Sequence, residues 1–200
     1  MEVIDHFLSF REMSPDDFRK SKSMSIVVDT NILVYRRRKD VQIQIDNLTD
    51  QFKKFADKFH RAKVNLIISQ VSIFELLTLT NLKSREKTKL LESIADYVTI
   101  PVNSKIQYFA AKMSNYYRKK GLSTKEVDIA DLYIGATAAL TATPILTANQ
   151  SHYPPFFFEE IARRNLSWKE KGRTKSLDIY LLNNRPKELS DDGFYKVVKK

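Results

Sequence analysis

Residues 26–33 restrict the fold more than any other part of this chain. They read Ile-Val-Val-Asp-Thr-Asn-Ile-Leu, an apolar run that ends on Asp29 and continues through a polar step into further apolar residues. We interpret the run as a short buried strand, followed by a helix capped by Asn31. Because ligands bind at the carboxyl ends of strands in open α/β sheets, Asp29 is predicted to face a ligand site.

Strand-like and helix-like segments alternate along the rest of the chain. Strands are predicted at 25–28, 64–69, 97–100, 144–147 and 177–182, and helices at about 31–36, 41–59, 70–80, 86–95, 103–120, 125–141 and 156–164. This alternation predicts a parallel sheet between two helical layers, joined by right-handed crossovers. The expected fold class is α/β, with a three-layer α/β/α arrangement and a central parallel sheet.

The length of 200 residues allows one full domain and leaves little room for a second. We expect the main domain to cover residues 24–185, with an N-terminal extension over 1–23 and a basic C-terminal tail over 186–200. The extension is predicted to be helical, because apolar residues near its start would share one helix face. Residues 14–17, Ser-Pro-Asp-Asp, also have the composition of a helix start.

Composition limits the class of protein. No apolar run approaches the ~18–20 residues that span a bilayer, so no membrane partner is expected. The chain has no cysteine, which excludes disulfides and thiolate metal sites and favours a reducing cytoplasm. The N-terminus also lacks the layout of a signal peptide. The net charge of +10 suits nucleic-acid binding and simple solubility equally well.

Three further segments each bring a carboxylate, or its amide counterpart, to the end of an apolar element. Glu75 lies on a helix that is otherwise apolar for a turn on either side. Asp128 and Asp131 are three residues apart and would share one helix face. Asn149 follows the fourth predicted strand. Each residue alone has an ordinary explanation, such as a helix cap or an exposed charge.

Taken together, the acidic residues predict a metal site. Carboxylates about 5 Å apart repel each other by about 3 kcal/mol per pair at an effective dielectric of about 20. Three such pairs would cost about as much as the stability of a whole domain, so the cluster must bind a cation or take up protons. Oxygen ligands favour Mg²⁺ or Mn²⁺, and the histidines at positions 6, 60 and 152 lack the spacing of a zinc site. An acidic pocket in a basic protein indicates a metal-dependent nuclease.

The segments around these acids resemble the PIN-domain family, and in particular the VapC-type toxins of toxin–antitoxin pairs. The matching segments are 27–33, the helix that carries Glu75, 131–138 and 145–149, which occur in the family order. The resemblance implies a compact α/β/α domain that is usually a homodimer. It also implies Mg²⁺- or Mn²⁺-dependent cleavage of RNA to 5′-phosphate and 3′-hydroxyl ends, and a protein antitoxin as a partner.

The same resemblance assigns roles to single residues. Asp29, Glu75 and Asp131 match the three principal acids of the family. Asn149 matches a fourth position that is Asp or Asn, and Asp128 is expected to add a negative charge and a further metal ligand. In the implied mechanism, Asp29 and Asp131 bind the metal, while Glu75 binds it or orients the attacking water. Asn149 positions a metal-bound water or a phosphate.

Other polar residues near the acids are expected to have structural roles. The hydroxyls of Thr30 and Thr147 are expected to bond local backbone rather than phosphate or the carboxylates. His152 stands where many relatives have Asp, and we interpret it as an exposed loop residue rather than as an acid. Tyr133 is bulkier than the usual neighbour of the third acid.

Basic residues gather near the first helix and in the last fifth of the chain. Residues 161–200 hold eleven Lys and Arg against five Asp and Glu, which supplies +6 of the net charge of +10. Arginines beside aromatic residues suit single-stranded RNA, and Tyr153 and Trp168 are expected to stack on bases. The three phenylalanines at 156–158 are instead expected to be core or dimer contacts. The predicted RNA-binding residues are Arg36, Arg37, Arg38, Arg163, Arg164, Lys169 and Arg173.

These observations lead to the prediction of a metal-dependent endoribonuclease. The main alternative is a PIN-fold protein with weak catalysis that binds or scaffolds RNA, which would bind RNA equally well without metal. A haloacid-dehalogenase-like phosphatase needs a second Asp two residues after the strand-end Asp, and that position is Asn31 here. A dinucleotide enzyme is excluded because the chain has no Gly-x-Gly-x-x-Gly segment.

Overall fold

The computed structural model describes residues 11–12, 24–36, 41–47, 64–79, 82–121, 127–153 and 155–184. These residues form one seven-stranded sheet in the order β1-β4-β3-β2-β5-β7-β6, with helices around it. The strands are β1 (Arg11–Glu12), β2 (Met24–Val28), β3 (Val64–Ser69), β4 (Val98–Ile100), β5 (Ile145–Thr147), β6 (Phe158–Glu170) and β7 (Arg173–Asn184). The helices are α3 (Thr30–Arg36), α5 (Gln70–Thr78), α6 (Ser84–Glu92), α7 (Ser104–Lys119) and α8 (Ile129–Thr141), with a further helix over 41–47 and the short 3₁₀ helix η1 (Gln150–His152).

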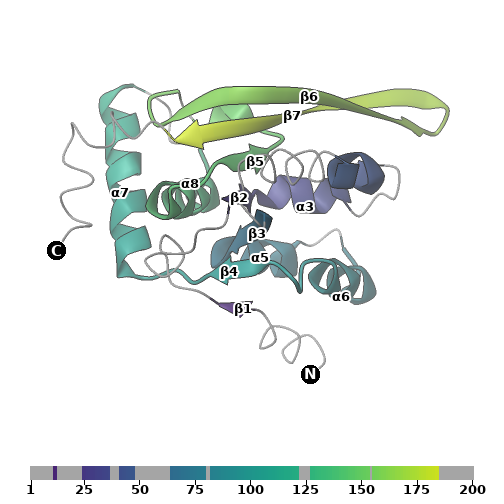
Figure 1. Ribbon diagram of the computed structural model, residues 1–200, viewed down its shortest axis with the longest axis horizontal. Helices are drawn as coiled ribbons and strands as arrows, with labels where there is room; N and C mark the ends of the chain where they lie inside the picture. Colours follow the sequence, from purple (N-terminus) through teal and green to yellow (C-terminus); the bar gives the residue numbers. More distant parts are fainter. Residues whose placement is uncertain are drawn as a thin grey trace.

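The central part of the sheet is parallel. Strands β1, β4, β3, β2 and β5 pair with one another in parallel. Helices cover both faces: Figure 1 shows α7 and α8 on one side of the central strands and α3, α5 and α6 on the other. The predicted three-layer α/β/α fold with a central parallel sheet is therefore confirmed.

The residues of β2 explain why this strand is buried on both faces. Val27 packs in a core with α7 and α8, whereas Ile26 and Val28 pack in a second core with α3, α5 and α6. Successive residues of a strand point to opposite faces, so a strand covered on both faces needs a continuous apolar run. The same run leads directly to Asp29, whose backbone N–H donates to the carbonyl of Leu146 at 3.0 Å.

The prediction of a helix over residues 156–164 is wrong. β6 and β7 form a long antiparallel hairpin, and β7 pairs with β5 so that the hairpin extends the parallel sheet. Its turn residues, Lys171 and Gly172, have φ angles of 48° and 78°, as a two-residue type I′ turn requires. The pairing register shifts between Glu160 and Ala162. This bulge interrupts the two-residue alternation, so the sequence does not reveal the strand.

The half of the hairpin that includes its turn packs against the helix over 41–47. Leu166 and Ile179 pack in the same core as the apolar residues of the helix over 41–47. The side-chain amide of Gln44 donates to the carbonyl of Ser167 at 2.9 Å and accepts from its N–H at 3.3 Å. In Figure 1 the hairpin runs above α3 and this helix.

Aromatic residues in and near the hairpin are buried in the core or partly buried against it. The ring of Trp168 lies 6.1 Å from that of Tyr35, so its predicted role in base stacking is not supported by its packing. Phe157 and Phe158 are buried against α7 and α8, as expected for core phenylalanines. Phe156 is partly buried beside Tyr116.

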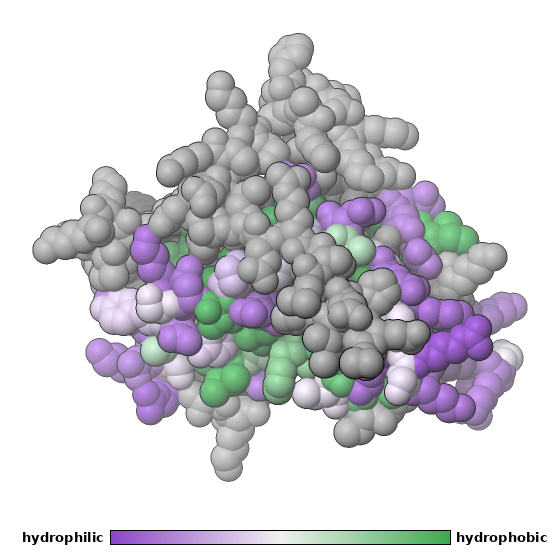
Figure 2. All heavy atoms as spheres, turned by 90° about the horizontal axis from the view of Figure 1, so that it is seen from below, coloured by the Kyte–Doolittle hydropathy of each residue, from purple (hydrophilic) through white to green (hydrophobic). Residues whose placement is uncertain are grey.

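Hydrophilic and apolar side chains share the face of the molecule that Figure 2 shows. In Figure 2, which views the molecule from below, apolar side chains appear as patches between hydrophilic ones. Phe74 and Ile129 are among the large apolar residues that are exposed. Among the described helices, none combines the length and the apolarity needed to cross a membrane.

Several predictions fall outside the described residues. Of the extension over 1–23, only Arg11 and Glu12 are described, as strand β1 beside β4. The helices predicted elsewhere in that extension, the tail over 186–200 and the later part of the helix predicted over 41–59 all lie outside the described residues.

Candidate active site

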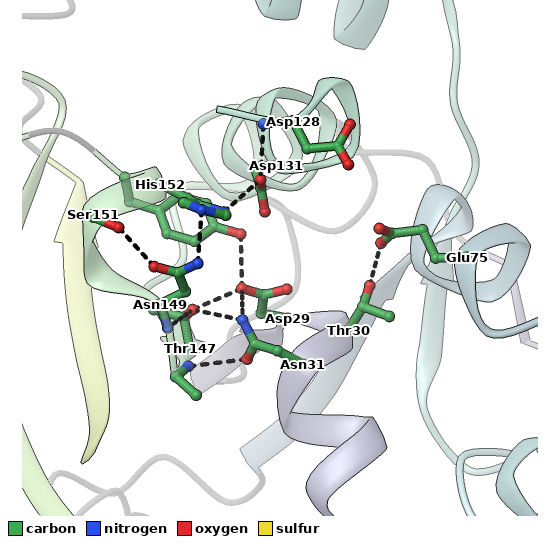
Figure 3. A network of polar contacts seen from close by, with 12 residues as sticks. Asp29, Thr30, Asn31, Glu75, Asp128, Asp131, Thr147, Asn149, Ser151 and His152 are labelled. Carbon is green, nitrogen blue, oxygen red and sulfur yellow. Dashed lines mark hydrogen bonds and ion pairs between the residues drawn. The ribbon is translucent and has the colours of Figure 1, made fainter. Parts of the chain in front are cut away.

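Three elements place acidic side chains around one space at the carboxyl end of the parallel strands. Asp29 follows β2, Glu75 lies on α5 and Asp131 lies in the first turn of α8. In Figure 3 the three carboxylates are directed towards this shared space. Residues separated by 46 and 56 positions in the sequence are thus brought together by the parallel topology.

Asp29 is held almost without exposure to solvent, at 2 %. Its Oδ2 atom accepts three hydrogen bonds, from Thr147 Oγ1 at 2.6 Å, Asn31 Nδ2 at 2.8 Å and Tyr153 OH at 3.0 Å. Its Oδ1 atom points into the space that the other acids face (Figure 3). Burial raises the pKa of Asp29 even though these bonds act in the opposite direction.

Asn31 bridges two strand ends and does not cap a helix. Helix α3 already begins at Thr30, so Asn31 lies inside its first turn. The side chain donates to Asp29 and accepts from the backbone N–H of Ala148 at 2.9 Å. The prediction of a capping role is therefore wrong, and the spacing Asp29-x-Asn31 is a signal for this bridge.

The two threonines that flank the strands bind the acids. The hydroxyl of Thr30 donates to the carboxylate of Glu75, and that of Thr147 donates to Asp29. The expectation that both hydroxyls serve local backbone is wrong for Thr30. The hydroxyl of Thr147 serves both, since its oxygen also accepts from the backbone N–H of Asn149 at 2.9 Å. Burial, together with the neighbouring carboxylates, raises the pKa of Glu75 to about 7.

Asp131 is bound by the loop that follows β5. Nδ1 of His152 lies 2.7 Å from Oδ2 of Asp131, and the backbone N–H of Asp128 donates to the same oxygen at 3.1 Å. Nε2 of His152 lies 2.7 Å from Nδ2 of Asn149, whose Oδ1 accepts from Ser151 at 2.7 Å. With 28 % of its side chain exposed, His152 is part of the site, so its interpretation as an exposed loop residue is wrong.

The remaining predicted site residues lie farther out. Asp128 is exposed at the start of α8 and its carboxylate points away from Asp29 in Figure 3, although its charge contributes to the raised pKa of Glu75. Tyr153 is buried and donates to Asp29, so the prediction that it stacks on bases is wrong. Its hydroxyl supports the site from the core side.

The predicted RNA-binding residues that the structure describes lie on the hairpin and at the end of α3. Arg163 pairs with Asp178 and lies 5.3 Å from the centre of the Tyr180 ring. Arg164, Lys169 and Arg173 are exposed on the hairpin. Arg36 is the last residue of α3, and the residues at 37 and 38 lie outside the described part of the chain.

The donor set fits a divalent ion held by two carboxylates and water. Within the described segments, no group of three or more acidic, histidine or cysteine side chains is arranged to hold a metal ion. Mg²⁺ commonly retains several waters and is bound through one or two carboxylates. Asp29 and Asp131 meet this need, because each is buried, each directs one oxygen into the shared space, and the charge of Asp29 raises the pKa of Asp131.

The raised pKa values predict that the metal-free protein loses stability as the pH rises. Burial and the charge of Asp29 raise the pKa of Asp131 from 3.8 to about 6, and that of Glu75 rises from 4.5 to about 7. Between about pH 4 and 7 the folded protein therefore holds protons that the unfolded chain has lost, so the free energy of unfolding decreases with pH.

We expect the melting temperature in EDTA to fall by about 3–6 °C between pH 5 and pH 8, which corresponds to ~1–2 kcal/mol after allowance for the solvent exposure of Glu75. Asp131→Asn should remove much of this fall, and circular dichroism melts would measure both. A melting temperature that rises across this range, in the wild type and the variant alike, would contradict the assignment.

Comparison with known proteins identifies the family. The family model of the PIN domain matches residues 26–153, which is more than half of the chain. The β6–β7 hairpin lies beyond this match. Comparison with curated proteins gave no match.

The comparison with solved structures gave matches that include three VapBC proteins. VapBC2 from Rickettsia felis, bound to a DNA fragment from its promoter, is 19% identical with a TM-score of 0.49, covering 64% of this chain and 90% of that one. VapBC-1 from nontypeable Haemophilus influenzae is 18% identical with a TM-score of 0.46, covering 65% and 90%. VapBC-5 from Mycobacterium tuberculosis is 22% identical with a TM-score of 0.42, covering 61% and 82%. On the strength of the family model, which spans the strand-end acids and the loop that binds them, the chain belongs to the PIN-domain family.

Proposed function

We propose that the protein is a metal-dependent endoribonuclease that hydrolyses phosphodiester bonds in RNA. The observation that carries this proposal is the pair of buried carboxylates, Asp29 and Asp131, with Glu75 beside them. Burial raises the pKa of all three acids, and neighbouring carboxylates raise those of Glu75 and Asp131 further, so the three are costly to keep charged unless a cation binds among them. Membership of the PIN-domain family supports the choice of a nuclease over another metal enzyme.

A divalent ion bound at this site would activate a water molecule and neutralise charge on the phosphate. Asp29 and Asp131 would hold the ion through the oxygens that point into the shared space (Figure 3). Glu75 would accept the proton of the attacking water, because its carboxylate faces the same space as Asp29 and Asp131 and burial raises its pKa. Thr30 holds the Glu75 carboxylate through its hydrogen bond.

The reaction breaks the bond between phosphorus and the 3′-oxygen, so the products carry a 5′-phosphate and a 3′-hydroxyl. The 3′-oxygen takes a proton from water as it leaves. Asn149 was assigned by resemblance to a water or phosphate, but both ends of its amide are bonded to His152 and Ser151. We therefore assign Asn149 to the support of His152, and Asp128 to the acidic rim of the site.

An RNA-cleavage assay with controlled metal content tests the proposal. A 5′-labelled single-stranded RNA and a DNA of matched sequence are incubated with the protein in Mg²⁺, in Mn²⁺ or in EDTA. We expect cleavage of the RNA in either metal, none in EDTA, and products with 3′-hydroxyl ends that a poly(A) polymerase can extend. Cleavage that persists in EDTA, or products with 2′,3′-cyclic phosphates, would contradict the mechanism.

The hairpin is proposed to bind the RNA backbone through exposed cations. Lys169 and Arg173 lie near its tip, outside the part of the chain matched by the family model. We expect the double variant Lys169→Glu/Arg173→Glu to bind RNA roughly ten-fold more weakly at low salt, because two phosphate contacts become repulsive. Filter binding in EDTA at several salt concentrations measures this, and the dependence on salt should become shallower.

A matched double variant controls for net charge. Arg85→Glu/Lys89→Glu changes the charge by the same amount on α6, where both side chains are exposed. If both double variants weaken RNA binding equally, the hairpin has no special role and only the overall charge matters.

A second candidate function is an RNA-binding scaffold with weak catalysis. It is favoured by one observation, that Oδ2 of Asp131 and the amide of Asn149 are already occupied by hydrogen bonds within the protein. Such a scaffold would bind RNA equally in metal and in EDTA and would cut it in neither, so the cleavage assay separates the two.

We also propose, on the resemblance of the motifs, that the protein acts as a homodimer and as the toxin of a toxin–antitoxin pair. The three structures named above are VapBC proteins, and one of them is described as a toxin–antitoxin system. A small DNA-binding protein encoded beside this chain, able to inhibit cleavage when added in equal amounts, would support the toxin role.

A further inference from the structure

The loop after β5 binds one oxygen of each of the two central acids. Thr147 and Tyr153, at the two ends of this loop, donate to Oδ2 of Asp29 at 2.6 and 3.0 Å. His152 contacts Oδ2 of Asp131 at 2.7 Å. The loop thus fixes both carboxylates from one side, and their Oδ1 atoms remain directed to the space between them (Figure 3).

The hydrogen bonds on the Asp131 side have a single direction. The Ser151 hydroxyl donates to Oδ1 of Asn149, and the Asn149 amide group then faces Nε2 of His152 as a donor. Nε2 must accept, so the proton of a neutral imidazole lies on Nδ1 and is donated to Asp131. In this series of hydrogen bonds, Ser151 donates to Asn149, Asn149 donates to His152, and His152 donates to the carboxylate of Asp131.

This arrangement is unsuited to a second cation. A cation needs lone pairs, but the lone pair of His152 Nε2 is used by Asn149, and Nδ1 presents an N–H to Asp131. Oδ2 of Asp131 already accepts from His152 and from the backbone of Asp128. The only carboxylate oxygens of this pair without a side-chain donor among the described residues are the two Oδ1 atoms.

We propose that His152 is a positioning residue that binds Asp131 in place of a second metal ion, so that the site holds one divalent ion between Asp29 and Asp131. This inference rests on the proposed metal-dependent function. His152 stands where many relatives have Asp. Its role as a partner of Asp131 makes the loop after β5 part of the metal-binding site.

Titration of the full-length protein with Mn²⁺ tests the inference without reference to activity. Isothermal titration calorimetry, with electron paramagnetic resonance to count free Mn²⁺, should give one ion per chain for the wild type. His152→Ala should weaken Mn²⁺ binding roughly ten-fold, because a lost partner of a ligating carboxylate typically costs that much. His152→Asn should restore most of the affinity, since its amide N–H can occupy the place of Nδ1.

His152→Asp tests the same idea in the opposite direction. It replaces an N–H donor by a carboxylate beside Oδ2 of Asp131, which creates the oxygen pair that a second ion needs. We expect the stoichiometry to rise from one to two Mn²⁺ per chain. Gln107→Glu is the matched control, because it adds the same charge at an exposed position on α7 without placing it beside another carboxylate that the structure describes as its partner.

The outcomes separate this inference from the proposed function. Two Mn²⁺ ions per wild-type chain, or a His152→Ala variant that binds Mn²⁺ as tightly as the wild type, would overturn the role of His152 while leaving a metal-dependent nuclease intact. A wild-type protein that binds no Mn²⁺ and cleaves no RNA would overturn both. Thermal melts in EDTA and in Mn²⁺ establish that each variant is folded, and His152→Asp should gain more stability from Mn²⁺ than the wild type does.

Discussion

Asp29→Asn is expected to reduce the rate of RNA cleavage by roughly a thousand-fold or more, which corresponds to about 4 kcal/mol of transition-state stabilisation. The amide oxygen of Asn can accept the same hydrogen bonds from Thr147, Asn31 and Tyr153 that Oδ2 accepts now. Its NH₂ group would replace Oδ1, which points into the space between the acids. The variant therefore keeps the local structure and loses the cation ligand.

Single-turnover cleavage with saturating Mn²⁺ measures the effect. Because burial raises the pKa of Asp29, a neutral side chain at this position should not lower the melting temperature in EDTA at pH 8. Asp96→Asn, at an exposed position before β4, is the control and should cleave at the wild-type rate. An Asp29→Asn protein that retains a tenth of the activity would remove Asp29 from the mechanism.

Glu75→Gln is expected to slow cleavage by roughly a hundred-fold, the usual contribution of a general base. The Gln side chain can still accept from Thr30, so the effect should come from the lost proton acceptor rather than from a displaced helix. The wild-type rate should fall as the pH drops below the pKa of the Glu75 carboxylate, because the protonated form cannot accept a proton. The variant should lack this dependence.

Rates measured from pH 5 to 8.5 in saturating Mn²⁺ check this prediction. Glu92→Gln, an exposed position at the end of α6, should leave both the rate and its pH dependence unchanged. If Glu75→Gln slows cleavage by the same factor at every pH, Glu75 positions a group instead of accepting a proton.

The parallel strands could be predicted from the sequence because each strand is specified by a short apolar segment of its own. Residues 26–28 and 64–69 are apolar runs whose length and composition indicate buried strands, and each carries a helix pattern directly after it. Once these strands are parallel, Asp29 must lie at the same sheet edge as the residues that follow β5. Asp131, at the start of a helix, and Glu75, within an apolar helix, are then expected to lie near the same edge of the sheet.

The partners of the acids could not be predicted, because they depend on contacts between distant segments. Thr30 meets Glu75 across 45 positions and Tyr153 meets Asp29 across 124. Side chains such as these have common local roles, and only the folded chain shows which role applies. Two of the contacts are local instead: Asn31 follows Asp29 by two residues, and His152 follows Asn149 by three.

The strand predicted over 177–182 lies within β7, whereas β6 and its pairing with β7 were missed for a different physical reason. The turn of the hairpin is Lys171-Gly172 rather than the Asn-Gly or Asp-Gly pair that marks most two-residue turns, and the bulge after Glu160 disturbs the alternation of β6. Its apolar residues also face a helix that begins at position 41, more than a hundred residues earlier. The bulge and the packing against this helix cannot be recognised in a short stretch of sequence.

Anomalous scattering from crystals soaked in Mn²⁺ tests most directly whether Asp29 and Asp131 bind a divalent ion. We predict one strong peak between their Oδ1 atoms, with a water or an oxygen of Glu75 completing the coordination, and its loss in crystals of Asp29→Asn. A soaked crystal with no peak between these two carboxylates, at a pH where both are ionised, would contradict the account.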